Sequence, residues 1–126
     1  MSTGCIFCRK VDLVHEGKLT YISLDRYPVS PGHALIVPKR HVPNYFDCTK
    51  HEITELWDSV NLAKQIIEKE HNPDSYNIGI NVSKVAGQSV PHTHIHLIPR
   101  YEGDVADPRG GVRSVIREKR TYKKSY

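Results

Sequence analysis

The sequence of 126 residues contains no apolar run of 18 or more residues, the length that a helix needs to cross a bilayer. Its opening stretch, MSTGCIFCRK, lacks the apolar segment of a secretory signal. Cysteine is scarce: only Cys5, Cys8 and Cys48 are present, and an odd number of thiols argues against a disulfide framework. We therefore expect a cytoplasmic protein with reduced thiols and no membrane partner.

The sequence also lacks internal repeats, low-complexity blocks and a cluster of carboxylates suited to Mg²⁺. Hydrophobic residues make up 38% of the chain and charged residues 25%, which is within the globular range. A chain of this length predicts one domain around one core.

Basic side chains are concentrated at the C-terminal end. Residues 109–126 hold seven Lys and Arg against one acid, a net charge of +6, whereas the whole chain carries +4. Residues 1–108 therefore carry about −2. We predict a folded domain over residues 1–104 and a basic tail over residues 105–126. The tail either attracts polyphosphate or nucleic acid, or is simply solvated; nucleic acid is not the partner we expect.

The N-terminal half of the domain predicts an antiparallel hairpin. LTYISLD, residues 19–25, is rich in β-branched and aromatic residues, and HALIVPK, residues 33–39, is a short apolar run. Two prolines and a glycine in residues 26–32 predict the turn between them.

A helix and two further strands follow. Thr49 and Glu52 form a capping box, and His71-Asn72-Pro73 ends the helix. Apolar residues recur behind the box at helical spacing and predict one buried stripe: Ile53, Leu56, Trp57, Val60, Ala63 and Ile67. Residues 75–82 and 92–101 alternate as strands. These elements predict an α+β fold, a mainly antiparallel sheet with a main helix on one face.

The stretch HTHIHLIPR places three of the eight histidines at alternate positions, His92, His94 and His96. On a strand they share one face at a spacing of roughly 6.5–7 Å, while Thr93, Ile95 and Leu97 face the helix. Three interpretations are open. The histidines could bind a catalytic zinc ion, they could act as nucleophile and proton shuttles, or they could have no role.

The residues before this strand favour nucleophilic work on phosphorus. Gly87 allows close approach of the backbone to a ligand, and the amide of Gln88 and the hydroxyl of Ser89 suit phosphate oxygens. A histidine that attacks phosphorus divides one difficult displacement into two easier ones.

Three segments carry a resemblance to a known family. HTHIHLI resembles the histidine-triad motif, and both LDRYPVSPGHALIVPKRHV and NIGINVSKVAGQSVPHTHIHLIPR are similar to the segments around it. The resemblance covers roughly residues 5–101 and is to the histidine-triad (HIT) nucleotide hydrolases, in a bacterial or archaeal form. It implies the HIT fold, with five antiparallel strands, a main helix, and a sheet that continues across a homodimer.

The resemblance also implies roles for individual residues. His94 matches the nucleophile, His96 the histidine that contacts the phosphate, and His33 an upstream histidine that supports the site. Four residues match substrate-binding positions near the ribose and the phosphates: Asp25, Asn81, Gln88 and Ser89. Because members that use another acceptor usually carry glutamine at the third triad position, His96 implies water as the final acceptor.

The pair Cys5 and Cys8 has the spacing of a zinc knuckle but supplies only half a site. The resemblance implies that His41 and His92 complete it, giving a structural zinc site. The alternative is that both cysteines are small buried apolar residues.

These observations predict a hydrolase that acts on the α-phosphate of dinucleoside polyphosphates, such as diadenosine tetraphosphate, with a purine nucleotide as substrate. Two alternatives stay open. One is a hydrolase of adenosine 5′-phosphoramidate, and the other is a nucleotide-binding regulatory protein whose turnover is incidental.

Overall fold

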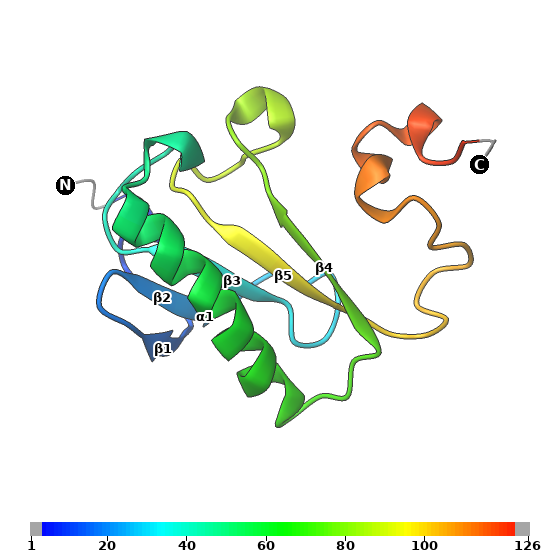
Figure 1. Ribbon diagram of the computed structural model, residues 1–126, viewed down its shortest axis with the longest axis horizontal. Coiled ribbons are helices and arrows are strands. Elements are labelled where there is room, and N and C mark those ends of the chain that lie inside the picture. The colour runs from blue at the N-terminus through cyan, green and yellow to red at the C-terminus, as the bar shows by residue number, and fades with distance from the viewer. Residues whose placement is uncertain (1–3, 123–126) are drawn as a thin grey trace.

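The computed structural model describes residues 4–122 and contains a single antiparallel sheet with a main helix on one face (Figure 1). The strands are β1 (Leu13–Glu16), β2 (Thr20–Leu24), β3 (Ala34–Pro38), β4 (Ser75–Ile80) and β5 (Ile95–Arg100). Their order across the sheet is β1-β2-β3-β5-β4. The predicted α+β class, with five antiparallel strands and a main helix on one face, is confirmed.

The main helix, α1 (Lys50–Glu68), starts at the predicted capping box: the Thr49 hydroxyl accepts from the Glu52 amide, and the Glu52 carboxylate accepts from the Thr49 amide. Its predicted stripe packs on the sheet, with Leu56 fully buried. Trp57 was expected in the same stripe but is 39% exposed, and its Nε1–H donates to the hydroxyl of Tyr45. The helical spacing alone therefore predicts a buried stripe that includes one residue, Trp57, too many.

The predicted hairpin is confirmed as β2 paired with β3, with Ile22 opposite Ile36. Strand β1 completes the sheet at one edge and was not predicted from its own residues. All four residues of β1 are exposed. Because no face of this strand covers the core, its sequence, LVHE, shows no alternation of apolar and polar side chains that would predict a strand.

The histidine-containing strand is shorter than predicted. β5 begins at Ile95, because both the amide and the hydroxyl of Thr93 donate to the carbonyl of Val42 instead of to a neighbouring strand. The predicted alternation holds within β5: Ile95 and Leu97 lie in the core against α1, and His96 points to the opposite face. This face, free of α1, is the one that carries the candidate site.

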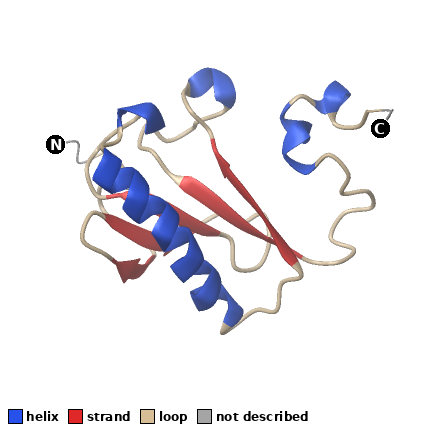
Figure 2. Cartoon of the chain, in the orientation of Figure 1, coloured by secondary structure: helices blue, strands red, loops and turns tan. Residues whose placement is uncertain are grey.

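Beyond β5 the chain forms a tail of loops and two short 3-10 turns (Figure 2). The first, η3 (Gly111–Val115), lies next to β4, and the second, η4 (Arg117–Lys119), lies next to η3. Lys123 and Lys124, which we counted in the basic tail, lie outside the described residues. None of the helices within residues 4–122 is both long and apolar enough to cross a membrane.

Candidate active site and metal centre

His94 is held as a neutral imidazole with one free nitrogen. Its Nδ1 lies 2.8 Å from the carbonyl oxygen of His92. Because a carbonyl oxygen only accepts, Nδ1 carries the proton and the lone pair lies on Nε2. Burial lowers the pKa of His94 and favours this neutral form at neutral pH. Such an imidazole has the electronic form of a nucleophile or a general base.

His33 and His96 form a hydrogen-bonded pair in which the position of each ring proton is fixed; we call this pair the relay. The Val29 amide donates to His33 Nδ1 at 3.0 Å, so neutral His33 carries its proton on Nε2. This Nε2 lies 3.0 Å from Nδ1 of His96, which accepts the bond. The proton of neutral His96 is then on its own Nε2. Burial lowers the pKa of both rings, so the relay leaves His96 as an N–H donor beside His94, whose ring centroid is 4.9 Å away.

Asp25 follows β2 and lies against this relay. Its Oδ2 is 3.5 Å from His33 Nε2, and its Oδ1 accepts from the amide of Tyr27 at 2.8 Å. Each carboxylate oxygen can accept more than one hydrogen bond, so Asp25 keeps capacity for hydroxyl donors of a ligand.

The loop between β4 and β5 closes the site on the other side. Gln88 uses its whole amide to hold this loop: Oε1 accepts from the Ser83 amide, and Nε2 donates to the carbonyls of Pro43 and Val90. Ser83 itself has a φ of 76°, a strained conformation for a residue with a side chain. The side chain of Gln88 therefore shapes the loop, and Ser89 next to it stays exposed.

The predicted site residues meet around two cavities. We call the first the nucleophile pocket; its volume is about 290 Å³, and it is lined by Phe7, Leu24, Ser89 and His94, among others. The second has a volume of about 500 Å³ and is lined by His33 together with residues of the C-terminal tail. Asp25, Asn81 and His96 line both. The fold thus brings these predicted residues together, while Gln88 lines neither of the two.

The cysteine pair meets two histidines at a separate centre. Nδ1 of His92 lies 3.4 Å from the sulfur of Cys5 and 3.6 Å from that of Cys8, and Nδ1 of His41 is 3.2 Å from Cys8 and 3.2 Å from His92 Nδ1. All four ligand atoms lie within 4.8 Å of one another. Neighbouring ligand atoms of a tetrahedral N₂S₂ zinc site are roughly 3.3–3.8 Å apart, given Zn–S near 2.3 Å and Zn–N near 2.0 Å.

The tautomer of His92 also fits a metal ligand. Its Nε2 lies 2.7 Å from the carbonyl of Pro38, so Nε2 carries the proton and the lone pair of Nδ1 faces the sulfurs. The three triad histidines do not form a group of converging ligand atoms among residues 4–122. The donor set therefore suits zinc at the cysteine centre, and the geometry does not favour a zinc hydrolase built on His92, His94 and His96.

The sequence did not predict two parts of the chain that line the cavities, Phe7 and the C-terminal tail. Phe7, between the cysteines, packs its ring edge-on against His94 with centroids 4.8 Å apart. Val112 and Val115 of the tail line the larger cavity. Because Phe7 lies between Cys5 and Cys8, the motif CIFC could have suggested that Phe7 lies near the site if the cysteines bind a metal there. The sequence of the tail carries no pattern that would have placed the tail beside the site.

Comparison with known proteins gives one family. The HIT domain matches residues 9–103. A bis(5′-nucleosyl)-tetraphosphatase (asymmetrical) of Schizosaccharomyces pombe is 42% identical over 93 residues, which cover 74% of this chain and 51% of that protein. An AP-4-A phosphorylase of Mycobacterium tuberculosis is 39% identical over 93 residues, which cover 73% and 48%. The chain thus spans about half the length of these two relatives.

Comparison with solved structures indicates the same family. The crystal structure of a Zn-bound histidine triad family protein from Mycobacterium smegmatis superposes with a TM-score of 0.76 at 28% identity and covers 85% of this chain and 82% of that one. The HIT match extends over three quarters of the sequence and includes all three triad histidines. The chain belongs to the HIT domain family.

Proposed function

We propose that the chain is a nucleotide hydrolase that attacks the α-phosphate of a dinucleoside polyphosphate, such as diadenosine tetraphosphate, with His94. The observation that carries this proposal is the tautomer of His94: Nδ1–H is engaged by the His92 carbonyl, so Nε2 is free to form a bond to phosphorus. The names of the two curated relatives support a dinucleoside polyphosphate as substrate.

In the first proposed step, His94 Nε2 bonds to the α-phosphorus and the bond from phosphorus to the leaving oxygen breaks. A nucleoside monophosphate unit then sits on His94, and a nucleoside polyphosphate departs. In the second step, water attacks the same phosphorus, the P–N bond breaks, and one water proton is lost to solvent. Diadenosine tetraphosphate and water thus give AMP and ATP. One proton is released in the second step, and another when the new phosphate hydroxyl of AMP ionises at neutral pH.

His96 is the proposed stabiliser of the phosphoryl oxygens, and His33 supports it. The relay fixes an N–H donor on His96, which can hydrogen-bond the negative charge that develops in the transition state. His33 supports this donor and does not touch the substrate in our proposal.

The substrate-binding assignments also remain proposals. We assign Asp25 to the ribose hydroxyls, because a carboxylate can accept from both. Asn81 and Ser89 line the nucleophile pocket beside His94 and can bind phosphate oxygens. Gln88 acts through the loop that it holds.

The final acceptor is water in this proposal, as His96 implies, although one relative is named as a phosphorylase. Inorganic phosphate tests this choice directly. With water as the acceptor, diadenosine tetraphosphate yields AMP and ATP whether or not phosphate is present. Formation of ADP in the presence of phosphate would show that phosphate is the acceptor.

We propose that zinc is a structural ion bound by Cys5, Cys8, His41 and His92. When bound, it would tie the N-terminal segment to the residues before β5. The Zn-bound relative supports this choice of metal. The nucleophile is a direct neighbour of the centre, since His94 donates to the backbone of His92 and packs against Phe7.

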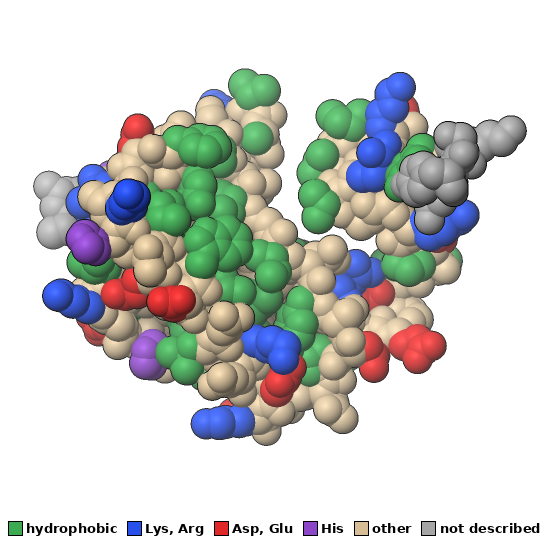
Figure 3. All heavy atoms as spheres, viewed as in Figure 1, with side chains coloured by type: hydrophobic (Ala, Val, Ile, Leu, Met, Phe, Trp, Pro, Cys, Tyr) green, Lys and Arg blue, Asp and Glu red, His purple; other side chains and the backbone are tan. Residues whose placement is uncertain are grey.

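We further propose a cytoplasmic homodimer. β4 is an edge strand, and its outer edge pairs with no strand of residues 4–122. Hydrophobic side chains also gather on the face that carries α1 (Figure 3), where Trp57 is 39% exposed. A strand edge without a partner strand, next to an apolar surface, suits extension of the sheet by a second copy.

A substrate panel tests the proposed activity. The values of kcat/KM for dinucleoside polyphosphates should exceed the value for adenosine 5′-phosphoramidate. A preference for the phosphoramidate would support the runner-up hydrolase. Nucleotide binding without turnover of either class would support the regulatory alternative.

A further inference from the structure

The larger cavity at the site is built partly by the C-terminal tail, which lies beyond the HIT match at residues 9–103. We call this cavity the tail cleft. One wall is the sheet face that carries His96 and Ile98, and the opposite wall includes Val112 and Val115 of the tail. Its volume of about 500 Å³ lies in the range of small-molecule sites.

The tail cleft leads away from the nucleophile. It shares Asp25, Tyr27, Asn81 and His96 with the nucleophile pocket, so the two cavities meet at the candidate reaction centre. His94 lines only the nucleophile pocket, whereas the tail cleft continues along β5 to Ile98. In a displacement at phosphorus the leaving group departs on the side opposite the nucleophile, so the tail cleft has the position of a leaving-group site.

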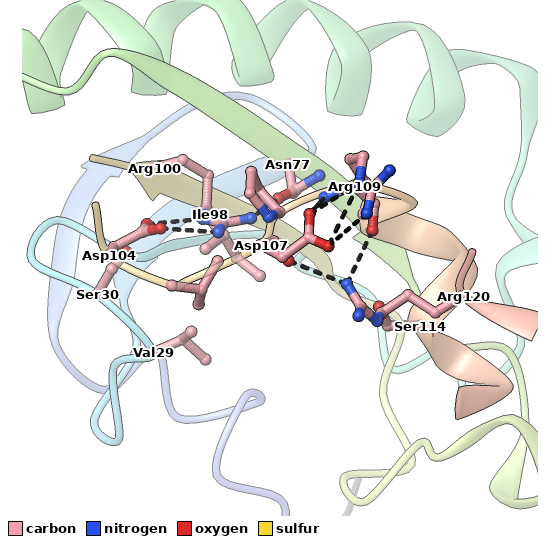
Figure 4. Close-up of a pocket in the computed structure, with 13 residues that line it drawn as sticks. Val29, Ser30, Asn77, Ile98, Arg100, Asp104, Asp107, Arg109, Ser114 and Arg120 are labelled. Atoms are coloured by element: carbon pink, nitrogen blue, oxygen red, sulfur yellow. Dashed lines mark hydrogen bonds and ion pairs between the residues drawn. The ribbon is translucent and has the colours of Figure 1, made fainter. Parts of the chain in front are cut away.

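The tail is folded on itself rather than loosely attached. Arg120 Nη1 donates to the carbonyls of Asp107 and Arg109, and the Asp107 carboxylate pairs with Arg109 at 3.0 Å. Figure 4 shows these contacts among the residues of a neighbouring pocket, which is lined also by Asn77, Ile98 and Ser114. Gly110 has a φ of 91°, and a Cβ there would meet the Arg120 carbonyl oxygen at 2.0 Å, so the tail closes around this glycine.

The side chains that line the tail cleft suit a flat apolar group. Six of its lining side chains are apolar or aromatic, and four of these are more than half exposed: Tyr27 (84%), Val29 (72%), Val112 (62%) and Val115 (78%). Gly79, opposite His96 in the β4–β5 pairing, leaves open space, because a Cβ there would meet nothing within 4 Å. A nucleobase buries apolar faces in such a cleft, whereas the ammonia released from a phosphoramidate would leave it unfilled.

We propose that the tail cleft binds the second nucleoside of a dinucleoside polyphosphate, the one that leaves when His94 takes the first. This inference rests on the proposed function and deepens it, because it assigns the tail to substrate selection. It also explains why two cavities share lining residues at the candidate reaction centre: one would hold the transferred nucleotide and the other the leaving nucleoside.

The double variant Val112→Asp/Val115→Asp in the full chain tests the inference. Charged groups in the cleft wall should disfavour the leaving base and lower kcat/KM for diadenosine tetraphosphate by at least about tenfold, mainly through KM. Hydrolysis of adenosine 5′-phosphoramidate should stay within about twofold of the unmodified chain, because its leaving group needs no second subsite.

Ile116→Asp is the matched control. It introduces the same charge in the same tail at a side chain that is 56% exposed and lines neither cavity at the site. Both activities should stay within about twofold in this control, the range expected for a surface change away from the site. Equal losses on both substrates, or no loss on either, in the double variant would overturn the inference while leaving the proposed hydrolase intact. Failure of the unmodified chain to hydrolyse either substrate would instead remove the proposed function, and the inference with it.

Discussion

At the scale of single residues, the site depends on which ring nitrogen carries a proton. The His92 carbonyl fixes the tautomer of His94, and the Val29 amide fixes that of His33 and, through it, that of His96. The alternation of histidines predicted a shared face, and the resemblance supplied their roles. The order of donors could not be predicted, because it depends on backbone groups that only the tertiary structure brings to the rings.

The nucleophile can be removed without removing its structural hydrogen bond. His94→Asn places a donor near the position of Nδ1, where it can still reach the His92 carbonyl, but offers no Nε2. We expect kcat to fall by at least about 10³-fold while AMP still binds. His51→Asn, at an exposed histidine of α1, is the control and should leave kcat unchanged. Full turnover by His94→Asn would exclude His94 as the nucleophile.

The relay predicts a dependence of stability on pH. Burial lowers the pKa of His33 and His96 in the folded protein, so the unfolded chain takes up protons first as the pH falls through about 6.5. The free energy of unfolding should therefore be larger at pH 7.5 than at pH 5.5, as measured by urea titration. His96→Asn keeps an acceptor for His33 but cannot titrate, so it should show a smaller pH dependence. An unchanged dependence in this variant would contradict the relay.

At the scale of elements, the hydrophobic pattern predicted what faces the core. The capping box placed the start of α1, and alternation placed β2, β3 and the inward face of β5. The hydrophobic pattern did not predict β1, because the side chains of β1 are all exposed. It also did not predict the start of β5, which is set by hydrogen bonds from Thr93 to the carbonyl of Val42. Patterns of burial predict elements that cover a core, and they carry no information about an exposed edge strand.

The N-terminal segment and the residues before β5 should be joined by one zinc ion. The unmodified chain is expected to retain about one zinc per chain through purification, and Cys8→Ser should lose most of it, as measured by elemental analysis. Chelation should lower the Tm of the unmodified chain but not of the variant, because a metal that binds only the folded state stabilises it. Cys48→Ser is the control, since Cys48 lies outside the group of ligand atoms. Equal zinc contents in all three proteins would rule out the site.

At the scale of the whole molecule, the HIT match covers residues 9–103, and described residues after it lie beside β4 and line a cavity at the site. The boundary at residue 104, predicted from the basic C-terminal end and from the extent of the family resemblance, stays a prediction. Charge alone left the tail either solvated or bound to an anion. Its place beside the site follows from tertiary contacts that no local pattern encodes.

The edge of β4, which pairs with no strand of residues 4–122, and the apolar face beside α1 predict a dimer. Light scattering should give about twice the chain mass of 14.4 kDa. Trp57→Lys places a charge on the face expected to be covered and should shift the mass toward that of one chain. The mass of a single chain for the unmodified protein at every concentration would show that the sheet does not continue across two copies.

The central claim is a covalent intermediate on a histidine, and the stereochemistry at the α-phosphorus tests it most directly. A substrate made chiral at that phosphorus with sulfur is hydrolysed in water enriched in ¹⁸O, and the configuration of the nucleotide product is determined. Attack by His94 followed by attack by water inverts the phosphorus twice, so we predict retention of configuration. Inversion would show that water attacks directly and would contradict the role of His94 as nucleophile.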